Sequence, residues 1–171
     1  AEMRAVADAT ATPDNPEPRL DVVRLLYSAR GFEAAEAELE SLISAAETGD
    51  AAVPLRLALA DMLIAEGRAE AAIEVLETAA AAAETRAEGD RARVALARVA
   101  FGAEDKERAA ALVATVLEDD PDNVEALALR AGVAIEELEL QSAIIDLRRA
   151  QSLAPENAGL FALEARALEL D

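Results

Sequence analysis

Apolar residues in this chain fall into segments of helical length, separated by short turns that carry Gly, Pro, Asp or Asn. Strand-forming residues are present, but they never alternate with polar residues over the length that a half-buried strand needs. The pattern therefore predicts an all-α fold. The predicted helices cover residues 18–29, 33–46, 52–66, 69–85, 91–102, 105–118, 122–135, 139–152 and 157–170.

The turn sequences between these helices recur along the chain. Thr12–Asn15 (TPDN), Asp120–Asn123 (DPDN) and Ala154–Asn157 (APEN) resemble one another, and Pro121 lies 34 residues before Pro155. A fixed period of this size is typical of a repeat protein in which each unit is a helical hairpin. This repeat therefore determines the predicted fold.

Two further turns use other residues for the same purpose, Thr48–Asp50 (TGD) and Glu88–Asp90 (EGD). In each of them we expect the glycine to end one helix. The aspartate that follows is then expected to be the N-cap of the next helix, which assigns N-caps to Asp50 and Asp90.

Aligned on their turns, the units place small and large residues at fixed positions. With the turn proline numbered 32, positions 8 and 20 are small, as they must be where the two helices of a hairpin touch, and position 24 is large and fills the seam to the neighbouring unit. Position 8 is Val23, Ala60, Ala97, Ala131 and Ala165, position 20 is Ala35, Ala72, Ala109 and Ala143, and position 24 is Leu39, Leu76, Val113 and Leu147.

This alignment predicts a single array that begins and ends inside a repeat. Residues 1–11 correspond to the tail of a second helix, and neither end has the polar capping unit that such arrays need. We therefore expect the sequence to be a fragment of a longer array. It divides into a partial unit over residues 1–15, units over 16–52, 53–89, 90–123 and 124–157, and a partial unit over 158–171.

The pattern resembles the tetratricopeptide repeat, which has small residues at positions 8 and 20, an aromatic residue at 24 and proline at 32. The stretch from Asp120 to Asn157 is the clearest copy, whereas Arg19, Arg56 and Arg93 occupy position 4, where the family has a large residue. The resemblance implies a right-handed superhelix of antiparallel helical hairpins, an α-solenoid. The chain is also similar to large repeat proteins of alphaproteobacteria with an exported, lipoprotein-type N-terminus, which favours a periplasmic or exported location.

Composition excludes several classes of function. The chain has no cysteine and no histidine, so Cys-based zinc sites, thiolate nucleophiles and the usual general base are absent. A net charge of −19 would repel nucleic acid and anionic membrane surfaces. No apolar run approaches the ~18 residues of a membrane helix, and the glycines form no phosphate-binding cluster. We therefore expect no enzyme, cofactor or metal, and neither a nucleic-acid partner nor membrane insertion of this segment.

The resemblance also implies where a partner would bind. In the family, positions 9 and 12 of each first helix point into a concave groove, and here they offer arginine together with aromatic residues from two units. Arg and Tyr are enriched at binding hot spots. The alternative is that these side chains pack on neighbouring helices or pair with groove acids. The candidate groove residues are Arg24, Tyr27, Asp61, Ile64, Arg98 and Phe101.

Two functions remain open at this point. The first is a scaffold that binds a protein or peptide in the groove, and the second is a structural spacer or self-association segment of a solenoid. The second gains from residues 158–170, whose apolar side would normally be covered by a second helix of the same unit. A homodimer through this helix would cover its four large apolar residues, Leu160, Phe161, Leu163 and Leu168.

Overall fold

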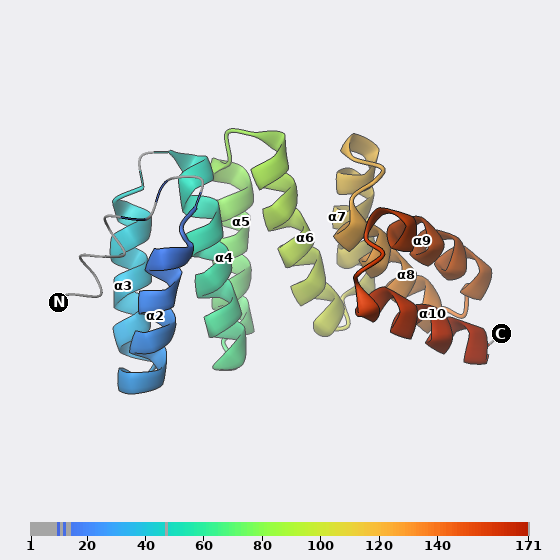
Figure 1. Ribbon diagram of the computed structural model, residues 1–171, viewed down its shortest axis with the longest axis horizontal. Helices are drawn as coiled ribbons and strands as arrows, with labels where there is room; N and C mark the ends of the chain where they lie inside the picture. The colour runs from blue at the N-terminus through green and yellow to red at the C-terminus, as the bar shows by residue number, and fades with distance from the viewer. Residues whose placement is uncertain (1–9, 11, 13–14, 47, 171) are drawn as a thin grey trace. The chain divides into compact units, whose positions relative to one another are not determined.

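The computed structural model of the chain describes residues 10, 12, 15–46 and 48–170. Within these residues the chain forms helices joined by short turns, and its one extended feature there is an isolated bridge between Thr12 and Asn15 (Figure 1). The predicted all-α class is confirmed. The helices are α2 (Glu17–Arg30), α3 (Phe32–Ser44), α4 (Gly49–Ala65), α5 (Ala69–Ala82), α6 (Arg86–Gly102), α7 (Lys106–Asp119), α8 (Val124–Glu136), α9 (Leu140–Leu153) and α10 (Ala158–Leu170).

Each helix predicted from the sequence is present. The largest difference is at the start of α6, which begins at Arg86, about five residues before the predicted position. The start of α4 at Gly49 and the end of α5 at Ala82 each lie about three residues before the predicted position. The helix tail predicted for residues 1–11 lies outside the described residues, except for Thr10.

The chain divides into two compact units, residues 1–92 and 93–171, and the division falls within α6. In the first unit α2 packs against α3, α3 against α4 and α4 against α5. In the second unit α7 packs against α8, α8 against α9 and α9 against α10. Short turns make consecutive helices antiparallel, so each unit is a stack of helical hairpins, as the pair α4 and α5 illustrates in Figure 1. This is the architecture of an α-solenoid.

The two helices of a hairpin touch through small residues, as the repeat pattern predicts. In each predicted complete unit, the residues at positions 8 and 20 are at most 2 % exposed, and the large residues at position 24 are equally buried. The predicted burial of the seam alanines is therefore confirmed. Ala165, at position 8 of the predicted partial unit 158–171, is exposed.

The turn inside each hairpin contains one residue with a positive φ. The residues are Gly31, Gly67, Glu104 and Leu138, with φ between 61° and 86°. This region suits glycine and costs other residues roughly 1 kcal/mol or more. Leu138 has a positive φ although its side chain is 70 % exposed. The tight turn, and not burial of the side chain, therefore fixes its backbone conformation.

The junction between α3 and α4 differs from the sequence expectation, because Thr48 and not Asp50 is the N-cap of α4. The Thr48 hydroxyl oxygen accepts a hydrogen bond from the backbone N–H of Ala51 at 3.1 Å. Asp50 lies in the first turn of α4, where α4 and α5 approach so closely that a Cβ on Gly49 would collide with the Ala82 carbonyl oxygen. Because of this close approach, α4 begins at Gly49, and Thr48 is therefore its N-cap.

Asp50 instead caps the following turn. Its carboxylate accepts hydrogen bonds from the backbone N–H groups of Glu84, at 2.7 Å, and Thr85, at 3.0 Å. In return, Glu84 accepts a hydrogen bond from the backbone N–H of Gly49 at 3.1 Å. These bonds tie the start of α4 to the segment between α5 and α6.

The helix break predicted at Glu88–Asp90 is absent. The helix α6 begins directly after Thr85, whose hydroxyl oxygen accepts from the backbone N–H of Glu88 at 3.4 Å. Gly89 and Asp90 lie inside α6 and are buried, so the predicted N-cap at Asp90 is wrong. A glycine inside a helix costs ~1 kcal/mol, and burial of this part of α6 offsets that cost. The unit boundaries drawn from this turn stay a prediction.

The apolar residues of α10 that were expected to be uncovered are not all exposed. Leu160 is 2 % exposed and belongs, with Ala167, to the core of the second unit, and Leu163 packs against that core. Only Phe161 and Leu168, at 48 % and 52 % exposed, remain open as predicted. The predicted exposure of Leu160 is wrong, because the face of α10 that carries this residue packs on α9.

The seam gives a first prediction, for the substitution Ala109→Leu. The larger side chain would overpack the contact between α6 and α7 and lower the free energy of unfolding by ~1–3 kcal/mol. The matched control is Ala110→Leu, because Ala110 is the next residue of the same helix and is exposed. Urea unfolding followed by circular dichroism measures both. Equal stability of the two variants would contradict the seam assignment.

Asp50 gives a second prediction, about pH. The hydrogen bond from the Thr85 backbone, followed by the bond from Glu84, holds the pKa of the Asp50 carboxyl below its ordinary value of 3.8. A pKa lower in the folded state means that the ionised group stabilises the fold above the ordinary pKa, and that this contribution is lost as the pH falls through the folded pKa. We therefore expect Asp50→Asn to lower the melting temperature at pH 7 but much less at pH 3. Glu107→Gln, at an exposed position of α7, is the control and should show no such difference. The same loss at both pH values would refute this role.

Candidate functional site

Four of the six predicted groove residues lie in the first unit, on α2 and α4. Arg24 is exposed, and its guanidinium pairs with Glu17 at 3.0 Å and with Asp21 at 2.7 Å on its own helix. These hydrogen bonds, that of Glu17 first, raise the pKa of Arg24 above its ordinary value. Arg24 is therefore accessible, but two carboxylates of α2 already compensate its charge.

Tyr27 is half-buried and joins α2 to the end of α4. Its hydroxyl donates a hydrogen bond to the Glu66 carboxylate at 2.8 Å, which raises the pKa of the phenol. Asp61 and Ile64 lie one turn apart on α4, and both are exposed, Ile64 by 40 %. The structure therefore brings Tyr27 and the end of α4 together through a hydrogen bond that holds the aromatic ring in place.

The other two predicted residues, Arg98 and Phe101, lie on α6 in the second unit. Arg98 is exposed and Phe101 is half-buried. A Cβ on Gly132 of α8 would lie 3.7 Å from two carbons of the Phe101 ring, so the ring rests against bare helix backbone. Ile135, at the position on α8 that corresponds to Tyr27, is only 1 % exposed. The second unit thus presents one arginine and one partly exposed aromatic ring at the predicted groove positions.

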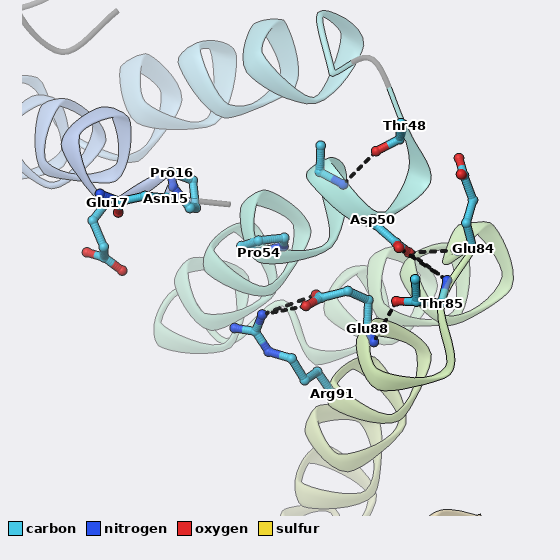
Figure 2. A pocket seen from close by; sticks show the side chains of 11 residues that line it. Asn15, Pro16, Glu17, Thr48, Asp50, Pro54, Glu84, Thr85, Glu88 and Arg91 are labelled. Atoms are coloured by element: carbon cyan, nitrogen blue, oxygen red, sulfur yellow. Dashed lines mark hydrogen bonds and ion pairs between the residues drawn. The ribbon is translucent and has the colours of Figure 1, made fainter. Parts of the chain in front are cut away.

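The first unit also has a cavity of about 620 Å³ that the sequence did not predict, at the N-terminal ends of α2, α4 and α6. Figure 2 shows Asp50 directed at Glu84 and Thr85, and Glu88 directed at Arg91. Each carboxylate that lines this cavity makes a hydrogen bond or an ion pair with another part of the protein. The polar groups of this cavity therefore hold the helix ends together and leave little bonding capacity for a ligand.

A second cavity, of about 530 Å³, lies in the same unit over α4 and between α3 and α5. The Nη1 atom of Arg56 is buried here without a hydrogen-bond partner. The signal in the sequence was the arginine at position 4, where the resemblance implies a large residue. The lining residues are Glu40, Ile43 and Ser44 of α3, Arg56 and Leu59 of α4, and Glu74, Val75 and Thr78 of α5.

Metal and membrane sites find no support among the described residues. In this part of the chain, no group of three or more acidic residues is placed to hold a metal ion. None of the described helices combines the length and the apolar character that crossing a bilayer requires.

Comparison with known proteins identifies the repeat. Residues 63–133 match the family model of the tetratricopeptide repeat. No curated protein matches the sequence.

Solved structures with the same fold extend over more of the chain. A tetratricopeptide repeat protein from Parabacteroides merdae ATCC 43184 is 15 % identical, with a TM-score of 0.68 over 90 % of this chain and 59 % of that chain. MamA is 16 % identical, with a TM-score of 0.61 over 87 % and 90 %. YrrB, described as a TPR protein with an unusual peptide-binding site, is 17 % identical, with a TM-score of 0.58 over 90 % and 81 %. Residues 63–133 therefore match the tetratricopeptide repeat in sequence, and most of the chain resembles tetratricopeptide repeat proteins in fold.

Proposed function

We propose that this chain is a non-enzymatic scaffold that binds a protein or peptide through the positions 9 and 12 of its first helices. The tetratricopeptide fold is typically one of protein interaction, and one protein of similar fold, YrrB, is described as peptide-binding. A sequence without histidine or cysteine lacks the usual nucleophiles and general bases, which favours binding over catalysis.

The anchored aromatic ring of Tyr27 is the observation that carries this proposal. A tyrosine whose hydroxyl is already bonded to Glu66 loses little conformational freedom when a partner packs on its ring. Ile64, exposed by 40 % near the same end of α4, adds apolar area. Arg98 and Phe101 offer the same combination of residue types in the second unit. The expected partner is an extended or helical segment with apolar or acidic side chains, and apolar contacts dominate at Tyr27 because Arg24 is already paired.

The test uses peptides selected on the intact chain from a random twelve-residue display library. Tyr27→Ala and Ile64→Ser should each weaken the selected peptides by roughly five- to thirtyfold, as loss of a hot-spot residue does. Leu25→Ser is the matched control, because Leu25 is 46 % exposed on α2 at a position outside the predicted groove. Helical circular dichroism should be the same in all variants. Selected peptides that bind all three variants equally well would exclude this surface.

Self-association is the alternative function, and α10 supplies the observation that favours it. Phe161 and Leu168 lie two turns apart on its open side, and each is about half exposed. Burial of such side chains is worth ~1.5–3 kcal/mol each. A second copy that packs α10 against α10 across a two-fold axis would cover both pairs. The homodimer is therefore the second candidate, with the chain acting as a segment that joins copies.

The homodimer has its own test. Sedimentation velocity across a range of protein concentrations should show dimers of the unmodified chain, and Phe161→Ser with Leu168→Ser should shift the equilibrium to monomers by about tenfold or more. The control replaces Leu138 and Ile145 by serine, since these residues of the same unit are 70 % and 69 % exposed but lie outside α10. A chain that stays monomeric, or a control that dissociates as readily, would reject α10 as the contact.

A further inference from the structure

Gly132 is the residue without a side chain among those at position 9 of the predicted units. The other residues at this position are all exposed, and they are Arg24, Asp61, Arg98 and Arg166. Position 9 therefore accepts long side chains elsewhere in the chain, so the repeat does not require a small residue there. Gly132 itself is half-buried inside α8.

The packing around Gly132 does not require a glycine either. A Cβ on Gly132 would lie 3.7 Å from the Cε1 and Cζ atoms of the Phe101 ring, which is an ordinary van der Waals distance. Gly49 differs, because a Cβ there would lie 1.8 Å from the Ala82 carbonyl oxygen. Alanine also favours a helix more than glycine does. The fold by itself therefore favours alanine at position 132, and the missing methyl group points to another requirement.

The surface around Gly132 is apolar. The backbone N–H and C=O groups inside α8 bond to one another along the helix. Ala128 lies one turn before Gly132 on the same face of α8, and it packs against the core of the second unit. Among the described residues, the Phe101 ring is the one part of another helix that would lie within 4 Å of a Cβ on Gly132. The missing methyl group thus leaves a space beside an aromatic ring and over an apolar stretch of helix.

This space suits a particular kind of side chain from the partner. We propose that it receives an apolar side chain of the bound protein or peptide, which packs on the Phe101 ring and on the backbone of α8. A charged side chain would lose hydration against these apolar groups without gaining a partner for its charge. Gly132 is then a specificity-determining residue, because a methyl group at this position would occupy the space. The inference rests on the proposed function, since Phe101 belongs to the predicted groove.

The first experiment measures the stability and the binding of Gly132→Ala. The probes are peptides selected on the intact chain from a random twelve-residue display library, and those that Phe101→Ala weakens are kept. We expect the melting temperature of Gly132→Ala to rise by roughly 2–4 °C, because alanine favours the helix. Affinity for these peptides should fall roughly fivefold or more, because the methyl group overpacks the contact. A residue that only supports the fold would change stability and affinity in the same direction.

The matched control is Thr115→Ala, which places an alanine at an exposed position of α7 outside the predicted groove. This substitution also favours the helix, but it should leave the affinity for the same peptides unchanged. An equal loss of affinity in Thr115→Ala would attribute the effect of Gly132→Ala to stability and would overturn the inference.

The second experiment identifies the side chain of the peptide that occupies the space. Each residue of a selected peptide is replaced in turn by alanine and tested against the unmodified chain and against Gly132→Ala. Replacement of one apolar residue should weaken binding to the unmodified chain by roughly fivefold or more, and should weaken binding to Gly132→Ala much less, because the two changes affect one contact.

The outcomes separate this inference from the proposed function. If peptides that depend on Phe101 bind Gly132→Ala as tightly as the unmodified chain, or if only a charged residue of the peptide is coupled to Gly132, the inference is overturned and the proposed function stands. If no selected peptide depends on Phe101, the inference and the proposed function of the second unit are both overturned.

Discussion

The close approach of helices at the hairpin seams is the constraint on which the rest of this structure depends. An alanine with almost no exposed surface at each contact lets two backbones approach until the leucines and valines beside it interdigitate. Ala131 and Ala143 make this contact for α8 and α9, in the core that also holds Leu127 and Leu147. Because the seam fixes the distance and rotation of the helices, it also fixes which positions of each first helix reach the surface. The predicted groove residues are exposed or half-buried because they lie away from the seam.

Arginine stands at position 4 of three predicted units, as Arg19, Arg56 and Arg93, where the resemblance to the family implies a large residue. Arginine has an apolar stem of comparable reach, but its guanidinium must find acceptors. At Arg56 the Nη1 atom is buried without a hydrogen-bond partner, and the residue lines a cavity between α3, α4 and α5. Arginine at position 4 does not by itself leave a donor unpaired, because Arg19 and Arg93 at the same position have partners.

Sequence reasoning succeeded where one physical requirement dominates. Seam positions demand small residues whatever surrounds them, so Ala109 and Ala143 could be placed from periodicity alone. It failed at Asp50 and Gly89, where local capping rules competed with tertiary contacts. Burial keeps Gly89 inside α6, and the close approach of α4 to Ala82 moves the cap of α4 to Thr48. Such contacts join residues more than thirty positions apart in the sequence, so they cannot be predicted from the residues of a single turn.

The candidate sites could be predicted only in part, for a related reason. Exposure of Arg24 and Tyr27 followed from their positions in the repeat, but their partners did not. The pairing of Tyr27 with Glu66 depends on how α2 meets the end of α4. The lack of a hydrogen-bond partner at Arg56 Nη1 depends on where the carboxylates of α3 and α5 lie. Periodicity gives the face of a helix on which a residue lies, but not the groups that approach it from the next helix.

The distribution of charge decides which ligands these surfaces favour. In the second unit several cations are used between helices: Arg130 binds Asp146 through two hydrogen bonds of 2.6 and 2.7 Å, and Arg148 binds Glu164 at 2.8 Å. Acidic residues outnumber basic ones by 35 to 16 in the whole chain, so pairing of this kind uses up the cations before the carboxylates. The carboxylates left over accumulate at the surface, where they attract cationic groups and repel anionic ones. Away from the arginines of the predicted groove, an exposed surface of this chain therefore favours an apolar or basic segment.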